Sequence, residues 1–465
     1  MKCGINIFDD LNTEKVNYVV WKNSNIIDNF FNGEENLDIY IHKDDHERFQ
    51  FLSKKNNWIE VKSTSNNFKE IKHYLFFAPN KILHIHAYFK LFTGNSISKN
   101  YDLSTFVNYF QNKHFDNRYR IWILNYDIQL LLFKIRIAIK RRSLLGRFLL
   151  LREKNNYKKE ISYIKNNIQT KNTNPKLDLI NINFLTTNLA DKKYVNNDYL
   201  LNSVKSFKRV NLFQTFIHEL LFLGNIFIQK LFKLKKFKFN KNQIIFISGP
   251  DSSGKTTITN DLKNLFKRHF KTKVFSIGKP YPVFFIKTLI KKNYFQNKKI
   301  SINHLTNKNI DPSYLRLLKN INLAIFRYIY SLNIFYFNQS TSIIILDRYL
   351  SENVGDVNGP RTIITNKGSS IKKIFSTIEI YFYKKTKFIN HEYQIITDLE
   401  NCLERNRKRY KAVKKNDDEI IKRFKKYNKS NFKSKEKFMI DNNAEKKGTI
   451  KYLLNLLSRS INENN

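Results

Sequence analysis

A glycine-rich turn between an apolar run and a helix-compatible stretch is the feature that most constrains this chain. Residues 244–257 read IIFISGPDSSGKTT and fit the pattern G-x-x-x-x-G-K-[ST] directly after a β-type segment. The glycines let the backbone wrap around an anion, and the N-terminus of the following helix turns its N–H groups toward that anion. The sequence therefore predicts a phosphate-binding loop between a strand and a helix.

The positions of this loop have separate roles. We expect the Lys255 ammonium to lie against the β- and γ-phosphates of ATP, and the Thr256 hydroxyl to bind Mg²⁺. The predicted nucleotide-binding residues are Gly249, Asp251, Ser252, Ser253, Gly254, Lys255, Thr256 and Thr257. ATP and Mg²⁺ are therefore the expected cofactors.

Net charge is the second feature that bears on function. The 465 residues include 83 Lys and Arg against 39 Asp and Glu, a formal net charge of +44. Such a charge would by itself favour binding to nucleic acid or to an anionic membrane. However, Lys, Asn, Ile, Phe and Tyr are abundant throughout, as an A/T-rich genome would impose, and the basic residues are not gathered in one tail. The composition therefore does not favour nucleic acid as the main partner.

Cysteine spacing and hydropathy indicate where the protein works. Cys3 and Cys402 lie at opposite ends of the sequence and match no metal-binding spacing, which favours a reducing compartment. Asp9 and Asp10 come before any apolar region develops, so no signal peptide is expected. The most apolar segment, residues 220–228, is too short to span a membrane. We expect a soluble, cytoplasmic protein.

Three segments of different character follow one another. Residues 1–120 mix strand-like and helical runs and predict a small α/β domain. Residues 121–240 predict a basic helical connector, whose helices pack on their neighbours, form a dimer surface or lie on an anionic membrane. Residues 241–465 alternate strands with helices, the pattern of a parallel sheet covered on both faces. The expected fold class is therefore α/β, with the phosphate-binding loop in the C-terminal parallel sheet.

Individual elements can be placed within these segments. The strands expected in the first segment span residues 17–21, 37–41 and 82–88, with a helix over 44–55. Helical runs are expected over residues 126–152 and 212–239 of the second. The strands expected in the third span residues 243–247, 273–276, 342–346 and 393–396, with helices over 257–269, up to about 337, and at the end of the chain.

A second motif ends one of these expected strands. The buried-type run 341–346 is followed directly by Asp347, Arg348 and Tyr349. A carboxylate at the tip of a strand parallel to the one before the loop can hold Mg²⁺ against the phosphates. Arg348 offers a planar fork for a second phosphate or a carboxylate. We therefore predict a metal-binding and catalytic role for Asp347 and a catalytic role for Arg348.

An arginine-rich stretch follows at residues 403–411. On a helix, Arg405 and Arg409 lie one turn apart on the same face. Phosphoryl transfer needs positive charge on the transferring group, and the phosphate-binding loop itself contains no Arg. Asn416 and Glu419 fit a capping box and predict a new helix, which makes the charged segment before it a mobile lid. Arg405 and Arg409 are therefore candidate catalytic residues, and the alternative is a solvated helix face.

Together these residues resemble the thymidylate kinase family. Residues 249–257 are similar to its phosphate-binding loop, residues 347–349 to its second motif and residues 405–409 to its lid. The similarity is closest to thymidylate kinase-like proteins that accompany surface-polysaccharide genes, which usually have Gly where this chain has Ser252. The run Asn-Gly-Pro-Arg at 358–361 resembles an Asp-Gly-Pro-Arg element of that group.

The resemblance covers about residues 241–435 and implies a nucleoside monophosphate kinase-like fold. It also implies that Asp347 assists the metal and the acceptor and that Arg348 binds the acceptor's phosphate. Thymidylate kinases continue past the second motif with a Ser and an Ala-Tyr-Gln, whereas residues 350–355 read Leu-Ser-Glu-Asn-Val-Gly here. The acceptor pocket therefore differs, and the acceptor stays open between a nucleoside and a nucleoside monophosphate.

The N-terminal segment resembles nucleotidyltransferase-fold domains, which accompany kinase-like domains in the same group. Gly33 followed by Asn36 and Asp38 is similar to their Gly…Asp-x-Asp strand. Transfer chemistry on that fold uses clustered carboxylates to hold two Mg²⁺. Here Asn36 replaces one acid, and His84 and His86 stand at the third-strand position, so only Asp38 is a carboxylate. The resemblance therefore implies a degenerate domain, and two histidines alone do not predict zinc.

The leading hypothesis is an ATP- and Mg²⁺-dependent phosphotransferase of the nucleoside/nucleotide kinase class, with ATP and a small phosphoryl acceptor as partners. One alternative is an ATP-binding regulatory or scaffold protein with weak catalysis. Another is a basic protein that binds nucleic acid or a membrane surface. The sequence leaves open a homodimer and a peripheral membrane contact.

Overall fold

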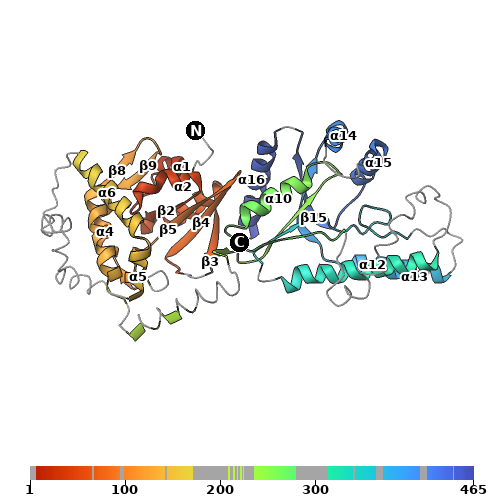
Figure 1. The fold of residues 1–465 in the computed structure, drawn as a ribbon, viewed down its shortest axis with the longest axis horizontal. Coiled ribbons are helices and arrows are strands. Elements are labelled where there is room, and N and C mark those ends of the chain that lie inside the picture. Colours follow the sequence, from red (N-terminus) through yellow and green to blue (C-terminus); the bar gives the residue numbers. More distant parts are fainter. Residues whose placement is uncertain are drawn as a thin grey trace. The chain divides into compact units, whose positions relative to one another are not determined.

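The computed structural model describes the chain in two compact units, Met1–Asn240 with Leu457–Asn465, and Lys241–Leu456 (Figure 1). The described residues are 7–64, 68–94, 99–141, 144–170, 208–209, 213–214, 217, 220–221, 224, 235–278, 313–338, 341–362, 370–408, 416–443 and 445–464. Both segments expected before residue 241 belong to the first unit. Among the described residues, no helix has both the length and the hydropathy of a membrane span.

The first unit contains a mixed sheet of eight strands in the order β10-β3-β4-β5-β2-β1-β9-β8. Its strands are β1 (Tyr18–Val20), β2 (Asn36–Ile41), β3 (Ile59–Ser63), β4 (Ile71–Ala78), β5 (Lys81–Tyr88), β8 (Lys113–Asp116), β9 (Ile121–Leu124) and β10 (Phe237–Lys238), with β6 (Phe92–Thr93) and β7 (Tyr101–Asp102) in a separate pair. Its helices are α1 (Ile7–Thr13), α2 (Ile27–Asn32), α3 (His46–Lys55), α4 (Tyr126–Arg141), α5 (Leu144–Arg152) and α6 (Lys154–Thr170), with 3₁₀ turns η1 (Ser24–Ile26), η2 (Lys43–Asp45) and η3 (Ser104–Gln111).

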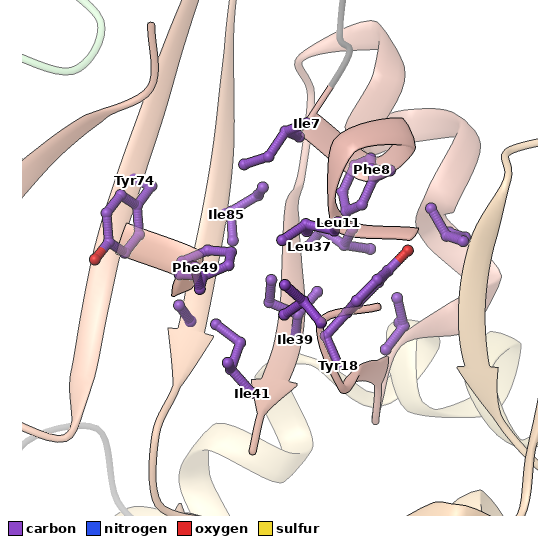
Figure 2. Packing of buried hydrophobic residues seen from close by; sticks show 14 of the residues in the cluster. Ile7, Phe8, Leu11, Tyr18, Leu37, Ile39, Ile41, Phe49, Tyr74 and Ile85 are labelled. Atoms are coloured by element: carbon purple, nitrogen blue, oxygen red, sulfur yellow. The ribbon is translucent and has the colours of Figure 1, made fainter. Parts of the chain in front are cut away.

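Two hydrophobic cores cover the two faces of this sheet. In β2, Leu37 and Ile39 point to one face while Tyr40 points to the other, as the period of a strand requires. The first core is formed with α1, α2 and α3 (Figure 2). The second is formed with α4, which buries Ile128 and Leu132 against the sheet. The beginning of the segment predicted as a connector, residues 121–240, therefore forms a helical layer of the first unit.

The second unit contains a sheet of five strands in the order β12-β13-β11-β14-β15, and every neighbouring pair is parallel. Its strands are β11 (Gln243–Ser248), β12 (Thr272–Phe275), β13 (Ile343–Leu346), β14 (Ile389–Ile396) and β15 (Ser434–Asp441). Its helices are α10 (Lys255–Phe266), α12 (Tyr314–Leu332) with the π-helical turn η5 (Asn333–Phe337), α13 (Ser370–Lys385), α14 (Leu399–Arg407), α15 (Asp417–Asn428) and α16 (Lys446–Asn464), which ends in the first unit's share of the chain. Helices α12 and α13 lie side by side (Figure 1).

The α/β class and the parallel C-terminal sheet are confirmed, and each strand expected from the sequence is present within a few residues of its expected bounds. Strand β15 was not expected, because it lies at the edge of the sheet and half of its side chains are polar and exposed. The helix expected over residues 212–239 falls mostly outside the described residues. The predicted C-terminal end of this helix is wrong, because Phe237–Lys238 forms strand β10, which pairs with β3 in antiparallel orientation.

Candidate active site

The parallel pairing of β11 with β13 brings the two sequence motifs to one edge of the sheet. Phe246 of β11 is in register with Leu346 of β13. The phosphate-binding loop leaves β11 two residues later, and Asp347 directly follows β13. Ligands of parallel sheets bind beyond this carboxyl edge. The sheet therefore brings Lys255 and Asp347 to the same edge, although they are 92 positions apart in the sequence (255 and 347).

Two glycines of the loop are required by its backbone. Gly249 has a φ of 151° and Gly254 a φ of 92°, both in the region that L side chains rarely adopt. A Cβ at Gly249 would lie 2.9 Å from the carbonyl oxygen of Ile395, and a Cβ at Gly254 would lie 2.7 Å from Nδ2 of Asn442. The sequence pattern therefore has the glycines where the turn needs them.

Ser252 occupies a third such position without being a glycine. Its φ is 67°, and its hydroxyl is buried without a hydrogen-bond partner among the described residues. A left-handed conformation costs a non-glycine residue about 1–2 kcal/mol. The kinase-like proteins that the chain resembles usually have Gly at this position. The serine of this chain therefore lies where the backbone conformation favours glycine.

We predict that Ser252→Gly stabilises the second unit. Relief of the left-handed strain and loss of an unpaired buried hydroxyl exceed the added entropy of glycine in the unfolded chain, for a net gain of about 1 kcal/mol. Differential scanning calorimetry would show a higher unfolding temperature. Ser253→Gly is the matched control, because Ser253 also buries an unpaired hydroxyl but has no positive φ. Equal shifts in both variants would contradict the role of φ.

Three side chains fix the carbonyl group of Ser253. Nδ2 of Asn442 donates to it at 2.7 Å, and Arg405 and the Thr397 hydroxyl donate at 3.4 Å. Arg405 also donates to the carbonyl oxygen of Asn442 at 2.8 Å. These residues come from α14, from the end of β14 and from the end of β15, so three elements hold the loop in one conformation. The predicted catalytic residue Arg405 therefore contacts the loop through its backbone.

Lys255 is half-buried beneath the loop. Its ammonium donates to the carbonyl oxygen of Pro250 and lies 6.0 Å from the centre of the Tyr427 ring. Burial lowers the pKa of Lys255 to about 8, with Asp251 and Asp347 opposing the shift and Arg348 adding to it. The charge of Lys255 is therefore within electrostatic reach of both predicted motifs, and a bound phosphate would stabilise it.

Asp251 joins the loop to two arginines. Its carboxylate lies 3.1 Å from Arg423 Nη1 and 3.9 Å from Arg348 Nη2. Arg423, on α15, also pairs with Glu419 one turn earlier at 2.5 Å. Sequence reasoning missed Arg423, because the Glu-Arg spacing of four indicates only a pair on the same helix and not a contact with the loop. The structure therefore adds a cation at the phosphate-binding loop.

The helix predicted at Asn416 is confirmed, since α15 begins at Asp417 with Asn416 as its N-cap. The capping box is wrong, because the Asn416 side chain makes no cap hydrogen bond and Glu419 pairs with Arg423 instead. Arg409 and the rest of the predicted lid, residues 409–415, lie outside the described residues. Of the two predicted catalytic arginines, Arg405 alone therefore belongs to the described residues.

Asp347 presents an unsatisfied oxygen at the sheet edge. Its backbone N–H donates to the carbonyl oxygen of Phe275 at 2.9 Å, and its Oδ1 is buried with no hydrogen-bond partner among the described residues. Burial raises the pKa of Asp347 against the opposing charges of Lys255 and Arg348. Thr256 is exposed in the first turn of α10. A free carboxylate oxygen and a free hydroxyl are the ligands that Mg²⁺ takes beside nucleotide phosphates, so these residues fit the ion.

Two buried ionic side chains organise the loop that follows the second motif. Arg327 of α12 donates to the carbonyl oxygens of Gly278 at 3.0 Å and Asn358 at 3.2 Å. Glu379 of α13 accepts from the backbone N–H groups of residues 361 and 362, at 2.8 and 3.1 Å. Both side chains are almost fully buried. Sequence reasoning missed both, because a single Arg or Glu in a helix carries no pattern.

The first unit brings together the polar residues that the sequence singled out there. Asn36 of β2 is in register with His84 of β5, and Asp38 with His86, while His73 of β4 is opposite His86. The prediction that His84 and His86 face the same side is confirmed, since both rings contact His73. Within the described part of the chain, no three His, Cys, Asp or Glu residues are arranged to hold a metal ion.

No protein-family model and no curated protein sequence matches this chain. Among solved structures, the deoxyadenosine kinase from M. mycoides with bound dATP is similar at 12% identity and a TM-score of 0.28, over 46% of this chain and 99% of that chain. The same kinase with the products dCMP and a flexible dCDP bound gives 15% identity and a TM-score of 0.28, over 46% and 98%. These scores are too low to establish a shared fold.

Proposed function

We propose that this protein is an ATP- and Mg²⁺-dependent phosphotransferase of the nucleoside/nucleotide kinase class, related to thymidylate kinases. The observation that carries the proposal is the convergence of the phosphate-binding loop, Lys255 and the unpaired Asp347 oxygen at the carboxyl edge of one parallel sheet. A phosphate-binding loop alone would fit many nucleotide-binding proteins. A carboxylate and Arg348 at the adjacent strand end favour transfer to an acceptor.

In this proposal the loop of residues 249–257 holds the β- and γ-phosphates with backbone N–H groups and the N-terminus of α10. Lys255 neutralises their charge, and Thr256 and Asp347 hold Mg²⁺. The ion, when bound, supplies positive charge that offsets the charge on the phosphate oxygens. The hydrogen bonds from Asn442, Arg405 and Thr397 to the Ser253 carbonyl hold the loop in one conformation before ATP binds. This reduces the entropy lost on binding.

Arginines supply the remaining charge in this proposal. Arg348 is exposed next to Asp347, and its long 3.9 Å contact with Asp251 leaves guanidinium donors for an anionic group of the acceptor. Arg423 reaches the loop through Asp251, and Arg405 holds the loop in place. Arg409 is assigned to the transferring phosphate as part of the lid. Charge of this kind lowers the barrier most when it is positioned before the reaction.

The acceptor in this proposal is a small molecule, a nucleoside or a nucleoside monophosphate. The exposed guanidinium groups of Arg348 and Arg361 favour an anionic acceptor. For the first unit we propose a degenerate nucleotidyltransferase-like domain, since Asp38 is the only carboxylate among the motif positions Asn36, Asp38, His84 and His86. Residues 121–240 as a basic connector, a cytoplasmic location and a homodimer stay predictions.

A turnover screen tests the proposed function. Purified protein is incubated with ATP and Mg²⁺ and with nucleoside monophosphates, nucleosides and sugars in turn, and ADP release is measured. We expect one acceptor class to raise ADP release well above the acceptor-free rate. ATP binding without stimulation by any acceptor would instead favour the regulatory or scaffold protein, and would count against the kinase.

A further inference from the structure

Polar and charged side chains of the first unit converge around Asp38, on the face of its sheet that α4 covers. Lys22 follows β1, Asp38 lies in β2, and Tyr88 ends β5. The Lys22 ammonium lies 3.3 Å from Oδ1 of Asp38 and donates to the Tyr88 hydroxyl at 2.9 Å. The Lys22 ammonium therefore lies beside Asp38, the only carboxylate of strand β2.

The negative charge of Asp38 is fully used within the protein. Besides Lys22, it accepts from Nδ2 of Asn23 at 3.1 Å and contacts Nδ1 of His86 at 3.0 Å. Burial alone would raise the pKa of Asp38, but Lys22 and His86 hold it well below its usual value. Burial lowers the pKa of His86 to about 4 and that of His73 to about 2, so both imidazoles are neutral at physiological pH. This surrounding does not attract a divalent cation.

Lys99 adds a second positive charge beside Lys22 and Tyr88. Its ammonium lies 5.6 Å from the centre of the Tyr88 ring, and that of Lys22 lies 4.9 Å from the same ring. Among the described residues, no carboxylate oxygen lies within 4.0 Å of Lys99. Burial and then the charge of Lys22 lower the pKa of Lys99 to about 7, and the more distant charge of Asp38 opposes this shift. Lys140 of α4 acts on it in the same direction and is paired with Glu153 only at 3.8 Å.

We propose that the Lys22–Lys99 pair beside Tyr88 binds a phosphate-bearing anion without a divalent metal. A partly buried ammonium without a close ion pair is costly, and an anion that accepts hydrogen bonds from two ammonium groups removes that cost. The cluster remains open to solvent, since Lys22 is 15% and His86 16% exposed. A phosphate group fits because it offers several oxygens to lysine charges that approach from different sides. This site is separate from the proposed active site and does not depend on it.

Isothermal titration of the Lys255→Ala protein with pyrophosphate tests this site. The substitution weakens the phosphate-binding loop, EDTA removes divalent cations, and a pH of about 6 keeps Lys99 charged while His86 stays neutral. We expect binding that Lys99→Gln weakens by ~10-fold or more, that Lys99→Arg retains, and that the exposed control Lys90→Gln does not change. ATP in place of pyrophosphate identifies the source. Tighter binding of ATP indicates a nucleotide, and equal binding indicates the phosphate group alone.

Thermal unfolding provides a second test that requires no substitution at Lys22 or Lys99. All three tryptophans, Trp21, Trp58 and Trp122, belong to the first unit, so their fluorescence reports its unfolding. Pyrophosphate should raise the unfolding temperature of this unit in the Lys255→Ala protein, because a ligand that binds the folded state stabilises it. No binding and no stabilisation, or equal affinity after Lys99→Gln, would overturn the proposal.

Discussion

Replacing Lys255 with alanine should lower kcat/KM for the phosphoryl transfer by about 100- to 1,000-fold, the usual loss when one preorganised charge is removed from the transition state. Lys255 is held under the loop by the Pro250 carbonyl group and is reached by the charges of Asp251 and Asp347. No other lysine lies in the loop, and Arg348 and Arg423 approach it only through Asp251. ADP release with the acceptor found in the screen measures the loss.

Lys263→Ala is the matched control for this prediction. Lys263 lies on the same helix α10, two turns after Lys255, and is exposed. Its removal changes the net charge by the same amount and should leave the rate within about twofold, because surface charges contribute little. Turnover that survives Lys255→Ala but falls with Lys263→Ala would contradict the active site and favour a function of the basic surface.

Replacing Asp38 with asparagine should destabilise the first unit by about 3 kcal/mol. The substitution keeps the size of the side chain but leaves the Lys22 ammonium without its carboxylate, and an unpaired buried charge costs about 3–5 kcal/mol. The lower end applies because Lys22 is 15% exposed. Tryptophan fluorescence during urea unfolding measures the change, since every tryptophan belongs to this unit.

Two further variants separate the buried pair from a general charge effect. Asp28→Asn removes an exposed carboxylate that pairs with the exposed Arg118 at 3.1 Å, and should cost less than about 1 kcal/mol. Adding Lys22→Met to Asp38→Asn should recover part of the loss, because the ammonium is then gone as well. If Asp38→Asn cost no more than Asp28→Asn, the Lys22–Asp38 pair would not support the fold.

Much of the second unit could be predicted because its signals are local. The run before Gly249 is apolar and β-branched, and the loop and helix follow within a dozen residues, so one short window contains strand, turn and helix. Strand β13 and Asp347 were predictable for the same reason. Strand β15 was not, because a polar edge strand has neither the apolar run of a central strand nor the alternation of a half-buried one.

The side chains that support the site could not be predicted in this way. Asn442 reaches the Ser253 carbonyl across 189 positions of the sequence, and Arg423 reaches Asp251 across 172. Nothing in the residues around Asn442 or Arg423 encodes these contacts. They depend on the order of strands in the sheet and on the helices that follow β14.

By itself the sequence determined a phosphate-binding loop with Lys255 and Thr256 in place, and a carboxylate at the end of a second buried strand. Spacing within a short segment is enough for this, because a strand, a tight turn and a helix N-terminus are set by neighbouring residues. Only the tertiary structure decided that Asp347 keeps an oxygen unpaired among the described residues, that Ser252 is strained and that Lys22 pairs with Asp38 while no described carboxylate lies within 4.0 Å of Lys99. Those properties depend on burial and on the distances between elements remote in the chain, which the packing within each unit fixes.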